Sequence, residues 1–159
     1  MKYVFFFLLL CTCFVRGQEI KVSSNWYEVM RVSDIYGAGN DYPLYVESKK
    51  KKSKISIKAF PKSKQKDIYE FFTVFVHLEP VNWHDSLELS IRRTSNGKGK
   101  SGVIYGGRNW QLIHRFSSDL FGTVGARKGI AVQYRIKGLS VLLPVDTYST
   151  EIVFTVLNL

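Results

Sequence analysis

The residues of this chain best suited to chemistry are three histidines, thirteen acidic residues and one glycine-rich, basic segment. His77, His84 and His114 form no pair two or four residues apart, so they lack the usual spacing of metal ligands. No two carboxylates are set off by a motif as the acid and base of a glycosidase, and no Gly-x-Ser-x-Gly elbow is present. We therefore expect no catalytic residue, metal site or cofactor, and a protein that is not an enzyme.

The glycine-rich segment Gly97–Ser101 reads Gly-Lys-Gly-Lys-Ser and is superficially similar to a phosphate-binding loop. A Walker A loop needs a glycine five residues before the glycine of its Gly-Lys-Ser end, and Thr94 stands there. No helical pattern begins at Ser101 to offer its N-terminus to a phosphate. The segment predicts a solvated loop rather than a nucleotide site.

Aromatic residues beside basic ones are the best candidates for recognition, because aromatic rings stack on sugars or bases while Lys and Arg attract acidic groups. Trp83 and Tyr105 lie in loop-like settings, whereas Trp26 and Trp110 lie in patterned strands and are expected in the core. The candidate ligand-binding residues are Trp83, Tyr105, Lys98, Lys100 and Arg108.

A run of four lysines lies between two predicted strands and is expected to form a solvated hairpin tip. It is the candidate polyanion-binding segment: Lys49, Lys50, Lys51 and Lys52. The whole chain has 23 basic and 13 acidic residues, a net charge of +10. Such a charge favours acidic glycans or other surface polyanions as partners, although it also simply promotes solubility.

Residues 1–17 have the pattern of a secretory signal peptide. Lys2 supplies the positive start, Tyr3–Leu10 is an apolar run, and the small or medium-sized residues Val15–Gly17 stand where a signal peptidase would cut. Removal of this peptide would take away Cys11 and Cys13 and leave a mature chain of charge +8. We expect a secreted protein, extracellular or on the cell surface, with the periplasm and a lipid anchor at the Leu10–Cys13 segment as alternatives. No second long apolar segment follows, so no membrane span is predicted.

Apolar and polar residues alternate along most of residues 18–159, as in strands with one buried face. Ile55 and Ile57 alternate with lysine and serine. In the same way, Ile130, Val132 and Tyr134 alternate with alanine, glutamine and arginine. The pattern predicts one all-β domain, a single Ig-like antiparallel β-sandwich, with a jelly roll or a barrel as alternatives. The expected strands are 19–22, 26–32, 42–48, 53–60, 69–79, 86–93, 103–105, 110–116, 130–137 and 148–158.

Three segments depart from simple alternation. Tyr69–Leu78 and Tyr148–Leu157 are apolar on both parities, which predicts central or doubly covered strands. Trp110–Phe121 also fits a helical spacing and is the one place where a short helix is expected. The stretch Thr94–Asn109 contains five glycines and predicts a long loop at one end of the sandwich.

The segment from Leu143 to Val156 combines a Pro-x-Asp-x-Tyr turn with a long alternating strand. Pro144 and Asp146 would set the turn, and Tyr148 would close a hydrogen bond like that of a tyrosine corner. This segment resembles the closing strand of bacterial pilin-type and spore-coat-U-like domains, and Gly37–Asp41 is a softer match to similar sandwiches. The resemblance implies a bacterial structural or adhesive subunit that polymerises by strand donation.

Two features of the chain depart from that family. The cysteines that are common in the family are absent. The mature N-terminus offers only Ile20, Val22 and Trp26 as the alternating apolar residues of a donor strand.

The sequence therefore predicts a non-enzymatic secreted surface or fimbria-like subunit that self-associates through sheet edges. The alternative is an extracellular carbohydrate- or polyanion-binding module, and an unrecognised hydrolase is a third possibility. The path of residues 18–25 separates strand donation from a self-contained sandwich.

Overall fold

The computed structural model describes residues 18–23, 25–34, 42–51, 53–59, 70–99 and 103–158. The predicted signal peptide, both cysteines, Lys52, Lys100 and the turn at Gly37–Asp41 lie outside the described residues. Within the described part, no helix has the length and apolar character needed to cross a membrane.

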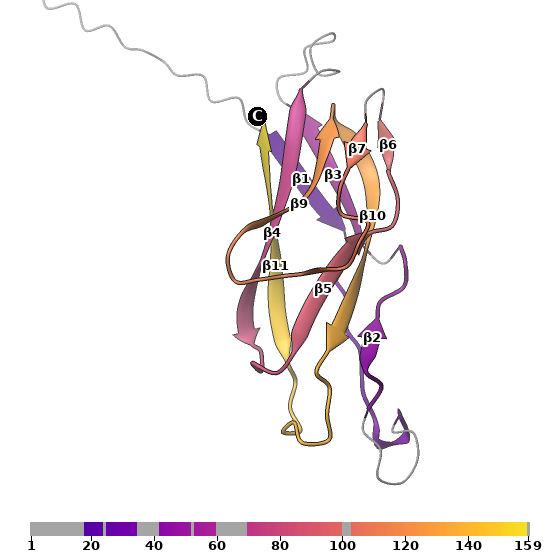
Figure 1. Cartoon of the computed structure of the whole chain (residues 1–159), viewed down its shortest axis with the longest axis vertical. Coiled ribbons are helices and arrows are strands. Elements are labelled where there is room, and N and C mark those ends of the chain that lie inside the picture. The colour runs from indigo at the N-terminus through magenta and orange to yellow at the C-terminus, as the bar shows by residue number, and fades with distance from the viewer. Residues whose placement is uncertain are drawn as a thin grey trace, which may run out of the picture.

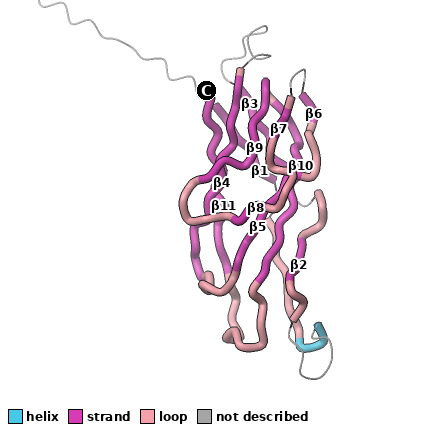
Figure 2. Tube along the Cα trace, in the orientation of Figure 1, coloured by secondary structure: helices cyan, strands magenta, loops and turns pink. Residues whose placement is uncertain are grey.

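The chain folds as two antiparallel sheets packed face to face, which confirms the predicted β-sandwich (Figure 1). The sheets do not close into a barrel, so that alternative is wrong. Almost all of the described regular structure is strand, apart from the short 3-10 turn η1 (Val32–Asp34) (Figure 2).

Sheet A has seven strands, with the order β1-β3-β10-β5-β8 and with β2 and β6 also paired to β10. Its strands are β1 (Gln18–Ser23), β2 (Tyr45–Glu47), β3 (Ser53–Ala59), β5 (Glu88–Arg93), β6 (Lys98–Gly99), β8 (Gln111–Leu112) and β10 (Arg127–Lys137). Sheet B has four strands in the order β11-β4-β9-β7. They are β4 (Phe71–Asn82), β7 (Ile104–Tyr105), β9 (Ser118–Val124) and β11 (Ser149–Asn158).

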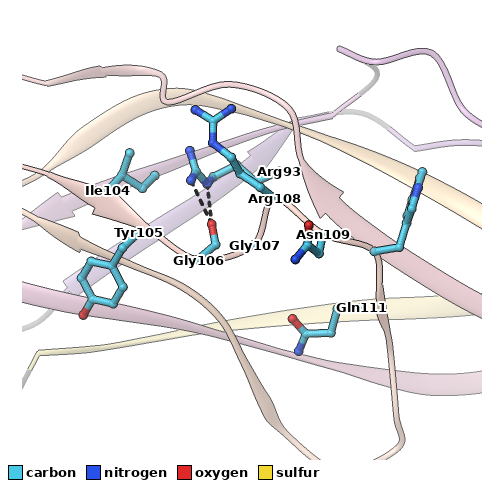
Figure 3. A pocket seen from close by; sticks show the side chains of 9 residues that line it. Arg93, Ile104, Tyr105, Gly106, Gly107, Arg108, Asn109 and Gln111 are labelled. Carbon is cyan, nitrogen blue, oxygen red and sulfur yellow. Dashed lines mark hydrogen bonds between the residues drawn. The ribbon is translucent and has the colours of Figure 1, made fainter.

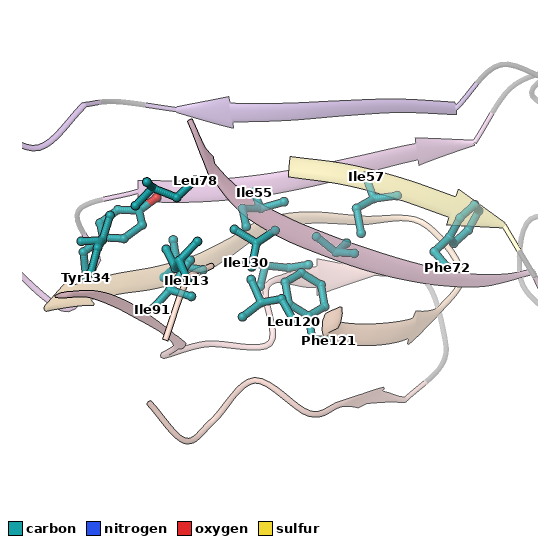
Figure 4. Packing of buried hydrophobic residues seen from close by; sticks show 14 residues of the cluster. Ile55, Ile57, Phe72, Leu78, Ile91, Ile113, Leu120, Phe121, Ile130 and Tyr134 are labelled. Atoms are coloured by element: carbon teal, nitrogen blue, oxygen red, sulfur yellow. The ribbon is translucent and has the colours of Figure 1, made fainter. Parts of the chain in front are cut away.

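The core lies between the sheets and is built from the apolar parity of the predicted strands (Figure 4). Ile55 and Ile57 of sheet A are fully buried, as are Phe72, Val74 and Val76 of sheet B. The two-residue period of side chains along a strand explains why alternation in the sequence located these residues correctly.

The helix expected over Trp110–Phe121 is wrong, because this segment contains strand β8, a loop and the start of β9. The register between β4 and β9 shifts between Val74 and Phe75, as at a β-bulge. Consecutive residues Leu120 and Phe121 are therefore both buried in the core. The helical spacing over Trp110–Phe121 thus comes from apolar residues of two strands and a loop, and not from one continuous element.

The predicted hairpin around the lysine run is also wrong. Strands β2 and β3 do not pair with each other, because both pair with β10, one after the other along its length. Ser48 stays buried beside β10, where its Oγ accepts a hydrogen bond from the backbone N–H of Tyr134 at 2.9 Å. Lys49, Lys50 and Lys51 thus lie in an excursion of the chain between β2 and β3, which both pair with β10.

Three smaller expectations have different outcomes. The strand expected over 26–32 is absent, and residues 25–31 are irregular before η1. Strand β4 lies inside sheet B as predicted, but β11 is an edge strand with only β4 as its partner. The hydroxyl of Tyr148 donates to the carbonyl oxygen of Pro144 at 2.6 Å, which confirms the predicted corner contact.

Candidate functional site

The two sheets differ sharply in charge. The four strands of sheet B contain no lysine or arginine, and their acidic residues are Glu79, Asp119 and Glu151. The strands of sheet A contain ten basic residues: Lys21, Lys54, Lys58, Arg92, Arg93, Lys98, Arg127, Lys128, Arg135 and Lys137. A site for an acidic ligand is therefore to be sought on sheet A and the loops that leave it.

Two of these arginines are buried. Arg93 ends β5 at a position that continues the inward parity of Leu89 and Ile91, and its side chain is only 4% exposed. Arg127 begins β10 and reaches towards the other sheet, where its Nε donates to the hydroxyl of Thr123 at 2.9 Å. Buried guanidinium groups are costly to desolvate, so their presence here needs hydrogen-bonding partners or a functional reason.

Neutral oxygen atoms satisfy the Arg93 side chain. Its Nε and Nη2 both donate to the carbonyl oxygen of Gly106, at 3.0 and 2.9 Å, and its Nη1 donates to the side-chain oxygen of Asn96. Burial lowers the pKa of Arg93, and the nearby charges of Arg108 and Arg127 lower it further. The charges of Arg108 and Arg127 thus act unfavourably on the buried guanidinium of Arg93.

Beside Arg93 and Arg108 lies a hollow of about 380 Å³ that is open to solvent (Figure 3). Its lining comes from Arg93 and from the segment that links β7 to β8, which includes Gly106, Gly107, Arg108 and Trp110. Gly106 and Gly107 both have positive φ, at 75° and 69°, a conformation that side chains disfavour. A Cβ on Gly107 would also lie 2.8 Å from the carbonyl oxygen of Leu120, so glycine is required there.

Arg108 is the exposed cation of this hollow. Its Nη2 donates to the same Asn96 oxygen that accepts from Arg93, at 3.1 Å, which holds the two guanidinium groups near each other. A guanidinium has five N–H donors, so this single bond leaves most of the donor capacity of Arg108 for solvent or a ligand. The arrangement suits a carboxylate, sulfate or phosphate group, which a guanidinium binds with two parallel hydrogen bonds.

A second arginine arrangement covers the outer face of sheet A. The guanidinium carbon of Arg135 lies 4.4 Å from the ring centroid of Tyr45 and 4.1 Å from that of Trp110. Arg92 also lies 4.4 Å from the Trp110 ring. Trp110 was expected in the core, but it lies on these outward-facing arginines, because cation–π contact offers an indole a good position outside the core.

Hydrogen bonds fix this stack. Arg135 pairs with the carboxylate of Glu47, at 2.9 and 2.5 Å from its Nε and Nη2. Gln133 accepts from Arg92 and donates to Glu47 at 3.0 Å, so it joins the two arginines through one carboxylate. This network holds Trp110 at the rim of the hollow.

The structure separates the two aromatic residues predicted to bind a ligand. Trp83 is half-buried in the turn between β4 and β5, at the opposite end of the sandwich from β7, and its indole N–H donates to the carbonyl of Leu87 at 3.0 Å (Figure 1). Tyr105 borders the hollow, but its ring is directed away from Arg108 (Figure 3). It covers Gly122 on sheet B, where an added Cβ would lie 2.1 Å from the tyrosine ring.

Of the basic residues predicted for the site, the structure describes Arg108, Lys98, Lys49, Lys50 and Lys51. Arg108 lines the hollow, and Lys98 is exposed on β6 opposite Lys128 of β10. Lys49, Lys50 and Lys51 are exposed, and the hydroxyl of Thr94 donates to the carbonyl of Lys50. Thr94 lies in the same short segment as Asn96, so the lysine excursion adjoins the segment that holds Arg93 and Arg108.

Sequence reasoning missed Arg93, Arg92 and Arg135 as site residues. A usable signal was present in the pair Arg92-Arg93, because adjacent strand residues point to opposite faces and one of the two must therefore face inward. Arg93 occupies the core parity of Leu89 and Ile91, where a cation is unusual.

No known protein family, curated protein or solved structure matches this chain, so the site rests on its own residues. The β-sandwich is shown, but the resemblance to pilin-type and spore-coat-U-like domains has no family match behind it. Within the described residues, no cluster of three or more histidines, cysteines or carboxylates is placed to hold a metal ion.

Proposed function

We propose that this protein is a secreted, non-enzymatic surface module that holds an acidic ligand in the hollow beside Arg93 and Arg108. The ligand class is a glycan or similar polymer that bears carboxylate or sulfate groups. Arg108 contacts an acidic group, and the lysine excursion and Lys98 attract the rest of the polymer.

One observation carries this proposal: a buried guanidinium that contacts neutral oxygens and is flanked by two further arginines. Burial lowers the pKa of Arg93, and the charges of Arg108 and Arg127 lower it further, so an anion in the hollow would offset this concentration of positive charge. Charge kept in an unfavourable setting is a frequent mark of a functional site.

The position of the N-terminal strand favours a binding module over strand donation. Residues 18–23 pair with β3 over six residues of their own sheet, from Gln18 opposite Ala59 to Ser23 opposite Lys54. A donor strand would instead leave its own sheet to complete that of a neighbour. The fimbria-like role stays a prediction. Of the surface roles that it includes, adhesion by binding an acidic glycan agrees with the proposed site.

The test compares Arg108→Gln with Lys54→Gln in binding to dextran sulfate, polygalacturonate and neutral dextran. Both substitutions remove one positive charge from an exposed side chain associated with sheet A, but only Arg108 lines the hollow. We expect Arg108→Gln to weaken binding to an acidic polymer about tenfold in calorimetry at physiological salt. Lys54→Gln should change it by no more than about twofold, as expected for general screening.

Equal losses in the two variants would show that binding depends only on overall charge and would contradict a site in the hollow. Equal binding to neutral dextran would contradict the acidic ligand class.

A further inference from the structure

The outer face of sheet B is apolar at one end and has no covering layer in the described structure. Directly paired residues of neighbouring strands point to the same face. The register places Leu157, Thr73, Gly122 and Tyr105 in one row across the sheet. None of the four is charged, and Leu157 and Tyr105 are 46% and 53% exposed.

The next row towards the same end of the sheet continues this character. Phe71 pairs with Val124, and the backbone N–H of Val124 donates to the carbonyl of Val103 at 2.9 Å. Phe71 is 51% exposed and Val103 is 68% exposed. Two successive rows thus present phenylalanine, leucine, valine and tyrosine side chains to solvent, which monomeric proteins normally avoid over a contiguous area.

We infer that this face, defined by Phe71, Val103, Tyr105 and Leu157, is the contact surface for a second copy of the same chain. A two-fold dimer requires a patch that is complementary to itself, and an uncharged apolar patch meets that requirement. Stacking of two sheets is an established way to bury such faces.

Charge identifies the second copy as the occupant. The whole chain carries +10, so two copies repel each other wherever lysine and arginine meet. The strands of sheet B contain none of these cations, whereas those of sheet A contain ten. Two copies can therefore approach through sheet B, while an acidic partner would be drawn to sheet A.

The carboxylates of sheet B limit the extent of the contact. Glu79 and Glu151 are paired with each other towards the other end of the strands, and Asp119 lies opposite Phe75. Facing carboxylates across a dimer would repel, so the contact is centred on the two apolar rows. Arg93 and Arg108, the cations of the hollow, are not among the residues that define this contact.

The test is sedimentation equilibrium of the purified protein from micromolar to millimolar concentration, without any ligand. We expect a reversible dimer in the unsubstituted protein. The double variant Phe71→Lys/Leu157→Lys should weaken dimerisation at least about tenfold, because it places like charges across the two-fold axis.

The matched control is Leu142→Lys/Val145→Lys, which adds the same two charges at nearly fully exposed apolar positions in the loop between β10 and β11. It should leave the dimer constant within about twofold if the effect is local. Thermal unfolding checks that the variants fold, and Leu157→Lys alone, near the end of an edge strand, is the fallback variant.

A protein that remains monomeric at every concentration would overturn the inference. So would a dimer that both double variants weaken equally, or one that survives Phe71→Lys/Leu157→Lys, which would assign the contact to strand edges. Because no acidic polymer is present, this result is independent of the outcome for the hollow.

Discussion

Sheets A and B share one hydrophobic core but have opposite chemistry elsewhere. Sheet A carries arginines on both faces, with Arg93 and Arg127 inward and Arg92 and Arg135 outward. Sheet B has no cation in its strands and leaves apolar side chains on its outer face. The difference teaches that positive charge is concentrated on one sheet of this sandwich, while the other sheet has an apolar inner face and an outer face that is apolar at one end.

The largest expected effect comes from the inner face of sheet B. Phe72 is fully buried, so Phe72→Ala should lower the free energy of unfolding by about 3–5 kcal/mol through lost burial and a cavity. Its neighbour Phe71 points outward, and Phe71→Ala should cost about 1 kcal/mol or less. Urea unfolding of both variants measures the contrast.

The inward cation of sheet A provides the comparison for that result. Arg93→Met keeps an apolar stem in place while removing a poorly solvated charge, so we expect a change of no more than about 1 kcal/mol. A loss as large as that of Phe72→Ala would show that Arg93 serves the fold rather than a ligand.

An intermediate effect is expected at the apolar end of the outer face of sheet B. Gly122→Ala would place a Cβ within 2.1 Å of the Tyr105 ring, which must then move. We expect a loss of about 1–3 kcal/mol by overpacking. The double variant Gly122→Ala/Tyr105→Ala should lose less than the sum of the two single variants in a double-mutant cycle. Strict additivity would contradict the packing of Tyr105 over Gly122.

The smallest effect at neutral pH concerns a polar group on the inner face of sheet A. Burial raises the pKa of Tyr134 above its ordinary value of 10.0, and its hydrogen bond with Ser53 opposes this less strongly. Above pH 10 the unfolded chain therefore loses this proton before the folded protein does, and stability falls as the pH rises towards the folded pKa. Tyr134→Phe should remove this part of the alkaline loss, while both proteins should respond alike to pH below that window.

Urea unfolding at a series of alkaline pH values measures this difference, since the other tyrosines and the lysines are common to both proteins. Parallel curves for the two proteins above pH 10 would contradict a perturbed Tyr134.

The core could be predicted from the sequence because it follows a local rule. Ile55, Ile57, Ile130 and Val132 were placed correctly from alternation, since side chains of a strand alternate between its faces whatever its partners. The burial of both Leu120 and Phe121 departs from that rule, because the pairing with β4, a distant segment, shifts beside them. A bulge depends on two strands at once and leaves no sure signal in either.

The candidate site was predicted only in part for a similar reason. Arg108 and the lysines were chosen as a basic region, and the structure places Arg108 in the hollow. Trp83 was grouped with them because it lies in a loop, but loops at opposite ends of a sandwich look alike in a sequence. The inward direction of Arg93 was implied by its parity in the strand. Its hydrogen bond to Gly106 could not be predicted, because it depends on the path of the chain after β7.

The sequence by itself determined the class of fold, the parity of each regular strand and the positive charge of the chain, because these depend on residue types and their nearest neighbours. Only the tertiary structure decided that β2 and β3 follow each other along β10, that the cations gather on one sheet, and that the outer face of the other sheet is apolar at one end. Strand order joins segments far apart in the chain, and no local pattern specifies which distant strand becomes a neighbour.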